Sequence, residues 1–483
     1  MLFNSIDFAI FLPIVFVLYW FITNKSIKLQ NLLIVVASYV FYGWWSWGFL
    51  SIIIFSTVID YTVCRLLSKA ENNIKRKLLL WISILANLAM LGFFKYYNFF
   101  LDNFVTAFLF FGKDIEANSL NIILPVGISF YTFQTLSYTI DVYKRKLKPT
   151  KDFIAFCAFV SFFPQLVAGP IERATHLLPQ FFRKRVFDYS NAVDGMRQIL
   201  WGLFKKILIA DNCARYANLI FNNSADYSGS TLVLGALFFT FQIYGDFSGY
   251  SDIAIGTSKL FGFDLMQNFN FPYFSRDIAE FWRRWHISLS TWFRDYLYIP
   301  LGGSRGNTLM KLRNTFIIFI LSGFWHGANW TFIVWGALNA IYFLPLLLTN
   351  RNRNNLDAIA KDKLIPDFKE FLSILITFGL TVFAWIFFRA ENIGHAFSYI
   401  SKICSSSLFE IPKFPGRLGA LTTIILILIF ILIEWYGRHG KYAIEKTLFK
   451  KRYLRWCFYY TIVIFIAYSF MTSIPQDFIY FQF

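Results

Sequence analysis

The sequence predicts an all-α, polytopic membrane protein. Of its 483 residues, 57% are hydrophobic and 21% are aromatic, whereas only 15% are charged. A soluble globular protein has about 25% charged residues, so this chain is too apolar for water. Apolar runs of about 20 residues, the length that crosses the hydrocarbon core of a bilayer, recur along it. We expect about ten to twelve spans with two or three amphipathic segments between them.

The charges around the first spans predict their orientation. Clusters of Lys and Arg follow the first, third and fifth apolar runs, and the loops between these clusters have no positive excess. Because basic loops stay in the cytoplasm, we expect the N-terminus to lie outside it. The five runs are 8–23, 31–49, 50–64, 78–111 (with a break near Lys95) and 122–143.

The last spans give an independent check on this topology. Apolar runs cover 368–388, 417–436 and 456–474, and the stretch 438–455 between the last two is the most basic loop of the chain. This loop should be cytoplasmic, which directs the last span outward and places the final residues, 475–483, at the outer surface. Both termini are thus predicted to be extracytoplasmic. We expect one membrane domain over 1–455, followed by a C-terminal span with an aromatic tail over 456–483.

Composition also restricts the partners and cofactors that we expect. The formal net charge of +18 follows the alternation of loops, so membrane topology explains it better than nucleic-acid binding. The five cysteines are odd in number and show no CxxC spacing, which predicts neither a disulfide framework nor a metal site.

His326 is the strongest candidate for a catalytic residue. It lies in the stretch LSGFWHGANW, inside an otherwise apolar run, where ionisable residues are costly and usually functional. A neutral imidazole can take a proton from a hydroxyl group and return it to a leaving group. Gly323 and Gly327 would let another helix or a substrate approach its backbone closely. The alternative is a hydrogen-bonded packing histidine.

A second histidine, His286, lies in a segment that we interpret as one amphipathic helix over 277–296. Large aromatic and aliphatic side chains fall on one face, and Arg283, Ser290 and Arg294 accompany His286 on the other. Guanidinium groups suit phosphate or carboxylate, so this polar face could hold an anionic group. Anchoring at the membrane surface is an equally good interpretation.

Three further segments carry weaker signals. Asp246–Asp252 has two acids six residues apart, which we interpret as a helix cap and turn, with a polar cavity as the alternative. The glycine-rich stretch Leu301–Gly306 lacks the spacing of a phosphate-binding fingerprint, so a plain loop is expected. Pro164–Pro170 is bounded by prolines, which favours a broken or re-entrant segment.

Several of these motifs together resemble the signature of membrane-bound O-acyltransferases. The resemblance rests on FWRRWHISLSTWFRDYLYIPLGG (281–303) and SGFWHGANW (322–330). It also rests on PVGISFYTFQ (125–134), FPQLVAGP (163–170) and DFSGYSD (246–252). They follow one another in one order over most of the chain. Within the family, the sequence is most similar to the bacterial branch typified by the alginate O-acetylation membrane protein.

This resemblance implies a ring of helices around a thin core with a central tunnel. It implies that His326 is the catalytic histidine of the family and that His286 is the second histidine of this branch. Arg283, Ser290, Arg294 and Asn329 then become candidate donor- or substrate-binding residues. The tail FIYFQF (478–483) is similar to the end of a small partner in D-alanine transfer to teichoic acids, which makes Tyr480 a candidate acyl relay. An aromatic interface anchor is the alternative for Tyr480.

The function implied is acetyl transfer across the bacterial cytoplasmic (inner) membrane for O-acetylation of an exported or cell-envelope polysaccharide. No bound cofactor is expected. The donor would be acetyl-CoA or the thioester of an acyl carrier protein, and an extracytoplasmic esterase-like (SGNH) acetyltransferase would complete delivery. The alternatives are D-alanine transfer from a carrier protein to teichoic acid, and a transporter or channel without chemistry. The lack of a visible internal repeat counts against a transporter.

Overall fold

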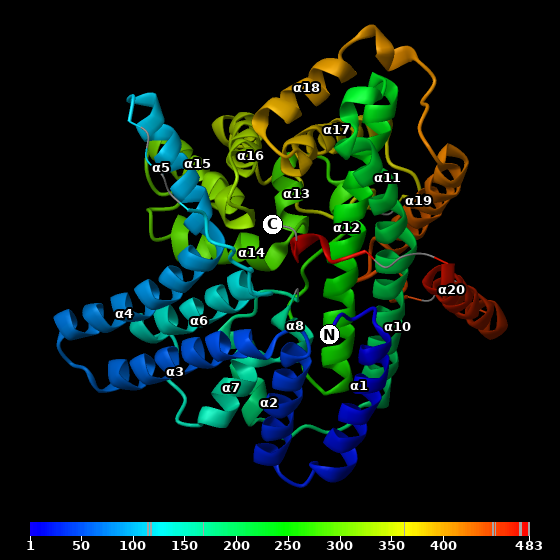
Figure 1. Cartoon of the computed structure of the whole chain (residues 1–483). Coiled ribbons are helices and arrows are strands. Elements are labelled where there is room, and N and C mark those ends of the chain that lie inside the picture. Colours follow the sequence, from blue (N-terminus) through cyan, green and yellow to red (C-terminus); the bar gives the residue numbers. More distant parts are fainter. Residues whose placement is uncertain are drawn as a thin grey trace. The chain divides into compact units, whose positions relative to one another are not determined.

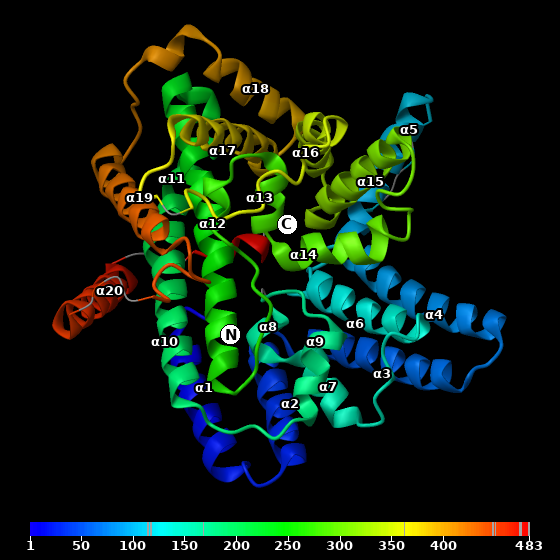
Figure 2. The same cartoon turned by 180° about the vertical axis from the view of Figure 1, so that it is seen from behind.

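The computed structural model of the chain is helical, and no strand occurs in the part of the chain that it describes. It describes residues 1–113, 115, 118–167, 169–361, 363–446, 449, 451–472 and 476–481. Figure 1 shows the helices from one side, and Figure 2 shows them from behind. The predicted all-α class is confirmed.

The chain divides into two compact units. Unit 1 comprises Met1–Ala192 and Thr257–Met266, and unit 2 comprises Val193–Gly256 and Gln267–Phe483. The main helices of unit 1 are α1 (Ile6–Val17), α2 (Ile27–Gly43), α3 (Trp47–Lys69), α4 (Asn73–Leu91), α5 (Tyr97–Phe110), α6 (Ile128–Tyr143), α7 (Phe153–Ser161), α8 (Phe163–Leu166) and α9 (Ala174–Leu177). The predicted tail segment, 456–483, lies within unit 2.

Unit 2 contains most of α10 and α12 and all of the later helices (Figure 1). Its helices are α10 (Tyr189–Leu203), α11 (Asp211–Asn222), α12 (Gly229–Leu260), α13 (Ile278–Arg284), α14 (Ile287–Phe293), α15 (Thr308–His326), α16 (Trp330–Leu348), α17 (Phe368–Arg389), α18 (Ile393–Ile403), α19 (Arg417–Gly437) and α20 (Arg452–Thr472). Both sequence motifs that contain the candidate histidines belong to this unit.

Seven helices within the described residues are long and apolar enough to cross a membrane. They are Trp47–Lys69, Asn73–Phe110, Gly229–Leu260, Trp330–Leu348, Phe368–Arg389, Arg417–Gly437 and Arg452–Thr472. Three shorter apolar helices accompany them, at Ile6–Ile22, Ile27–Gly43 and Phe153–Leu166. The seven long helices are fewer than the expected ten to twelve spans, and the three shorter apolar helices account for part of the difference.

Several local irregularities lie where the sequence predicts them, and one expected helix is shorter than predicted. A π-helical turn, Gly92–Tyr96, joins α4 to α5 at the break expected near Lys95. The expected helix 122–143 begins only at Ile128, because Pro125 precedes it and Gly127 adopts a left-handed conformation with φ of 75°. After Pro164, α8 ends within one turn, as expected of a broken segment. Leu301–Gly306 is a loop in which Gly302 and Gly303 have positive φ.

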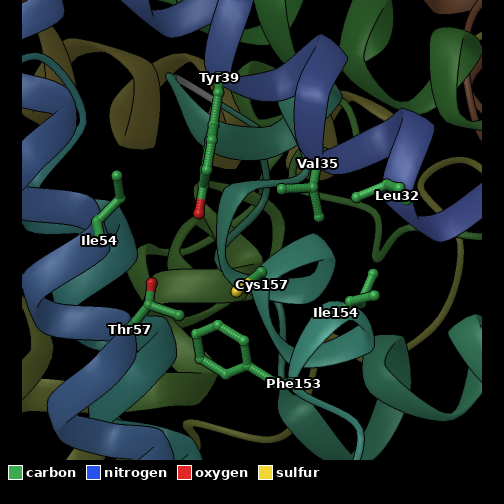
Figure 3. Close-up of a pocket in the computed structure, with 8 residues that line it drawn as sticks. All are labelled: Leu32, Val35, Tyr39, Ile54, Thr57, Phe153, Ile154 and Cys157. Carbon is green, nitrogen blue, oxygen red and sulfur yellow. The ribbon is translucent and has the colours of Figure 1, made fainter.

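Unit 1 has an apolar cavity of about 280 Å³ between α2, α3 and α7 (Figure 3). The side chains that line it are Leu32, Val35, Tyr39, Ile54, Thr57, Phe153, Ile154 and Cys157. None of these lining groups is a histidine, a carboxylate or a cation. The cavity therefore offers apolar contact but no general base for acyl transfer.

His176 in unit 1 contacts two carboxylates, Glu172 and Asp264, that are distant from each other in the sequence. Its Nδ1 lies 2.8 Å from Glu172 Oε2, and its Nε2 lies 3.6 Å from Asp264 Oδ2. Asp264 and then Glu172 raise the pKa of His176 to about 10, so its ring is charged at neutral pH.

We expect the contribution of His176 to stability to depend on pH. Because its pKa is raised on folding, the contribution is fully present below the unfolded pKa of about 6.5 and is lost as pH rises towards 10. Replacement by glutamine, His176→Gln, should lower the melting temperature of the detergent-solubilised protein most at pH 6 and least at pH 10. A difference in melting temperature that stays constant over this range would contradict the assignment.

Candidate active site

His326 ends helix α15, where the chain turns into α16. The two helices pack closely because glycines leave no side chain between them: a Cβ atom on Gly323 would lie 2.2 Å from the carbonyl oxygen of Phe332, and one on Gly336 would lie 2.3 Å from that of Phe319. Gly327 likewise makes room for the Phe332 ring. The close approach predicted at Gly323 and Gly327 is thus confirmed, and the neighbour is α16.

His286 lies at a break between two short helices, so the prediction of one helix over 277–296 is wrong. Helix α13 ends at Arg284, and His286 adopts a left-handed conformation with φ of 43° before α14 begins. Hydrogen bonds to a neighbouring segment of the chain cause this break. The amide of Asn270 donates to the carbonyl oxygen of Arg284, and the amide of Ile287 donates to that of Asn268. A continuous helix would use these groups itself.

Asn268 also fixes the ring of His286. Nδ1 of His286 lies 3.0 Å from the carboxamide oxygen of Asn268, which also accepts a hydrogen bond from the Ser288 hydroxyl at 2.9 Å. Because this oxygen can only accept, Nδ1 of His286 carries the hydrogen and Nε2 acts as an acceptor. Burial lowers the pKa of His286 to about 3, so the imidazole is neutral. The sequence pattern gave no signal for Asn268.

The two candidate histidines lie in one buried aromatic cluster. Their ring centroids are 6.5 Å apart, and His286 and His326 are only 1% and 3% exposed. Trp325, Trp335 and Phe388 surround His326, with ring centroids 4.9, 5.2 and 5.3 Å from its own. Residues that are 40 positions apart in the sequence thus form one site within unit 2.

Tyr480 from the C-terminal tail completes this cluster. Its ring centroid lies 5.6 Å from that of His326 and 4.4 Å from that of Phe247 on α12. Its hydroxyl oxygen is buried, and Phe478 and Ile479 are at most 1% exposed. The tail is therefore packed inside unit 2 at these residues, and its extracytoplasmic orientation stays a prediction. In Figure 2 the last turn, in red, lies against α12 and close to α13.

The other predicted site residues are distributed around this cluster rather than within it. Arg283 donates to the carbonyl oxygens of Asn352 and Asn355, at 2.8 and 2.9 Å. Asn329 caps α16, accepting from the amide of Thr331, and donates to the carbonyl oxygen of Glu391.

Ser290 and Arg294 line a separate cavity of about 240 Å³ in unit 2. Its other lining residues are Trp282, Leu289, Phe293, Tyr298, Ser304, Thr315, Ile318, Phe319, Ser322, Phe343, Asn352 and Arg353. Ser322 precedes His326 by one helical turn on the same face of α15. The cavity therefore brings two arginine side chains beside α15, and its last lining residue on this helix lies one turn before His326.

The interpretation of Asp246–Asp252 as a cap and turn is wrong, because both acids lie inside the long helix α12. Asp246 Oδ1 lies 3.0 Å from Nζ of Lys206, and Asp252 Oδ2 lies 2.6 Å from Nζ of Lys205. The two lysines come from a π-helical segment, Phe204–Ala210, about 40 residues earlier. Their charge allows the acids to be buried, and a local pattern cannot predict such distant pairs.

The class of protein is now defined: it is a multi-pass, all-α membrane protein with two buried histidines beside its C-terminal tail. The sequence model of the family described as MBOAT, membrane-bound O-acyltransferases, matches residues 144–387. This match covers about half of the chain and includes both histidine motifs. The chain belongs to the membrane-bound O-acyltransferase family and is an O-acyltransferase.

Named relatives extend over most of the chain. It is 39% identical over 448 residues to the probable alginate O-acetylase AlgI of Azotobacter vinelandii. The alignment covers 92% of this chain and 86% of the relative. It is 38% identical over 425 residues to the peptidoglycan O-acetyltransferase of Helicobacter pylori, covering 82% and 78%. It is 27% identical over 293 residues to the teichoic acid D-alanyltransferase of Bacillus subtilis, covering 57% and 71%.

Proposed function

We propose that the protein transfers acetyl groups from a cytoplasmic thioester donor across the bacterial cytoplasmic membrane, for O-acetylation of an exported or cell-envelope polysaccharide. The acetyl group is favoured because the relatives with about 39% identity over most of the chain are named as alginate or peptidoglycan O-acetylases. D-Alanine transfer is the weaker alternative, since that relative is less similar and covers less of the chain.

The observation that carries the mechanism is the position of Tyr480 beside His326. Burial raises the pKa of the Tyr480 phenol, so it keeps its proton at neutral pH and needs a base to act as a nucleophile. His326 accepts this proton as the phenolic oxygen attacks the thioester carbonyl carbon. The carbon–sulfur bond breaks, the proton passes to the leaving thiolate, and the acetyl group remains on Tyr480.

The second half of the reaction returns the enzyme to its starting state. A hydroxyl group of the acceptor attacks the acetyl carbonyl carbon on Tyr480, and His326 takes the hydroxyl proton. The Tyr480 phenolate then leaves and receives this proton from His326. His286 acts as a positioning residue. Its neutral ring packs against Phe247 at 4.6 Å between centroids, and Phe247 in turn packs against Tyr480.

The cavity lined by Ser290 and Arg294 is the site that we propose for the donor. Arg294 and Arg353 supply guanidinium groups that suit the phosphates of acetyl-CoA. Arg283 bonds to the backbone of Asn352, a lining residue of this cavity, and Arg283 and Asn329 both stay candidate substrate contacts. A carrier-protein thioester would present the same reactive group but would bind mainly outside the cavity.

Charge supports the sidedness of this scheme. The basic stretch 438–455 should lie in the cytoplasm, so α20 leads outward and the tail returns to His326 from the outer side. An esterase-like transferase at the outer face would then accept the acetyl group and deliver it to the polysaccharide. Membrane lipid surrounds the apolar helices.

Transfer from defined donors tests the proposal. We expect purified protein in lipid vesicles to transfer label from radiolabelled acetyl-CoA, and Arg294→Ala to raise KM for acetyl-CoA roughly tenfold, because a charge-assisted hydrogen bond contributes about 1.5–3 kcal/mol. Arg305→Ala, in the exposed loop outside this cavity, is the matched control.

The alternatives give different results in the same assay. Transfer from a D-alanyl carrier protein, with none from either acetyl donor, would support D-alanine transfer instead. Passage of intact acetyl-CoA into the vesicles without acetylated product would support a transporter. Transfer from an acetyl carrier protein alone would retain the acetyl group but replace acetyl-CoA as the donor.

A further inference from the structure

The C-terminal tail contacts a buried cluster of charges as well as the aromatic cluster. Nζ of Lys206 lies 2.8 Å from Asp211 Oδ1 and 3.0 Å from Asp246 Oδ1, and it donates to the carbonyl oxygen of Gln476 at 2.9 Å. The other oxygen of Asp246, Oδ2, accepts from the backbone amide of Ile479 at 2.7 Å. One ion pair thus bonds to the tail backbone on both sides of Phe478.

A buried ion pair lowers the stability of the fold unless its remaining donors and acceptors are hydrogen-bonded. Lys206 is 1% exposed and Asp246 is 2% exposed, and removing each of these charges from water is unfavourable. Their mutual attraction offsets this cost only when further hydrogen bonds satisfy the remaining donors and acceptors. The tail supplies two of these bonds, so the ion pair and the seated tail stabilise each other.

The helices around the ion pair are shaped to form it. Lys206 lies in the π-helical segment Phe204–Ala210, and π-turns are frequent at functional sites. Glycines of α12 allow this segment to approach: a Cβ atom on Gly249 would lie 3.1 Å from the amide nitrogen of Lys206, and one on Gly245 would lie 3.0 Å from the carbonyl oxygen of Lys205. Asp246, between these glycines, therefore reaches Lys206.

Aromatic contacts lock the tail side chains next to these backbone bonds. Phe478 packs on Tyr250 of α12 with ring centroids 4.2 Å apart, and Tyr480 packs on Phe247. The polar bonds fix the path of the backbone, and the rings fix the direction in which the side chains point. Tyr480 follows Ile479 directly, so the bond from Ile479 to Asp246 sets the position of Tyr480 beside His326.

We propose that Lys206 and Asp246 form a latch that holds the C-terminal tail inside unit 2 and positions Tyr480 against His326. Both are positioning residues that act through the tail backbone. The consequence for catalysis rests on the proposed function of Tyr480, whereas the latch itself can be tested without any activity.

Accessibility of a cysteine in the tail tests the latch directly. Cys404 and Cys457 are exposed, so both are first replaced by serine, and Ile479→Cys is then introduced as a buried reporter. We expect Lys206→Met to raise the rate of maleimide labelling of this cysteine in detergent-solubilised protein at least about tenfold, because Asp246 loses its charge partner and the tail loses a bond.

Lys205→Met is the matched control for this experiment. Lys205 is the adjacent lysine, is also buried, and pairs with Asp252 rather than with the tail. We expect little change in labelling in this variant. Unchanged labelling in Lys206→Met, or an equal rise in both lysine variants, would overturn the latch.

A second pair of variants separates the latch from the role of Tyr480. Ile479→Pro removes the amide that donates to Asp246, while Ile479→Val keeps it. We expect Ile479→Pro to lower acetyl transfer at least about tenfold, with no further loss when it is combined with Lys206→Met, because both changes break the same connection. Raised labelling with full transfer in Lys206→Met would leave the latch standing and reject the catalytic role proposed for Tyr480.

Discussion

Replacing His326 by alanine is expected to lower acetyl transfer by about 10²–10⁴-fold, the usual contribution of a general base. The physical reason is that the buried phenol of Tyr480 holds its proton at neutral pH, and His326 is the imidazole that packs against it. The measurement is the initial rate of transfer from labelled acetyl-CoA in membranes with equal amounts of each variant.

Two controls separate chemistry from folding in this experiment. His395→Gln changes a histidine of α18 that bonds to Ser224, and it should keep the wild-type rate. The His326→Ala protein should remain in the membrane and elute as wild type in detergent. Normal transfer in this variant would remove His326 from the mechanism.

The pH dependence of the rate distinguishes the two site histidines. Because burial lowers the pKa of His286 to about 3, this residue is neutral throughout the range of ordinary assays. A change in rate with pH in that range must come from another group, so His286→Gln should lower the rate without moving the profile. A shifted profile would show that His286 titrates and would contradict its assignment as a positioning residue.

Hydropathy was sufficient to predict the position of several long apolar helices, whereas the orientation that the loop charges predict stays a prediction. The expected runs 368–388 and 417–436 differ by one residue at the C-terminus from α17 and α19, and the expected run 456–474 lies within four residues of α20 at each end. A span requires a long apolar run, and this requirement is local and independent of tertiary contacts. His326 became a candidate for a similar reason, since an ionisable residue in an apolar run is visible in the sequence alone.

The site itself could not be assembled from such local signals. The break at His286 exists because Asn268 and Asn270 take over backbone bonds that a helix would otherwise form. Asp246 looked like a helix cap because its partner, Lys206, is 40 residues away. The tail was expected at the outer surface because the basic loop 438–455 directs the last span outward, and the two backbone bonds that hold Gln476 and Ile479 against buried charges were not predicted. Each of these features depends on contacts between distant segments.

Replacing Tyr480 by phenylalanine is expected to abolish acetylation of the tail and to lower overall transfer by ~10²-fold or more. The change removes one hydroxyl group and keeps the ring that packs on Phe247 and His326, so the tail should stay in place. The measurement is mass spectrometry of the C-terminal peptide after a brief reaction with acetyl-CoA and rapid denaturation. Wild-type protein should carry one acetyl group on the phenolic oxygen of Tyr480.

Tyr468→Phe provides the matched control, because Tyr468 lies on the exposed side of α20 in the same C-terminal segment. This variant should acetylate its tail and transfer at the wild-type rate.

The comparison with His326→Ala then decides the order of events. If Tyr480→Phe transfers normally while His326→Ala does not, His326 activates the acceptor hydroxyl directly and the acetyl group never rests on the tail. If both variants lose transfer and only wild-type protein carries the acetyl group, the tail is the carrier between the donor and the acceptor.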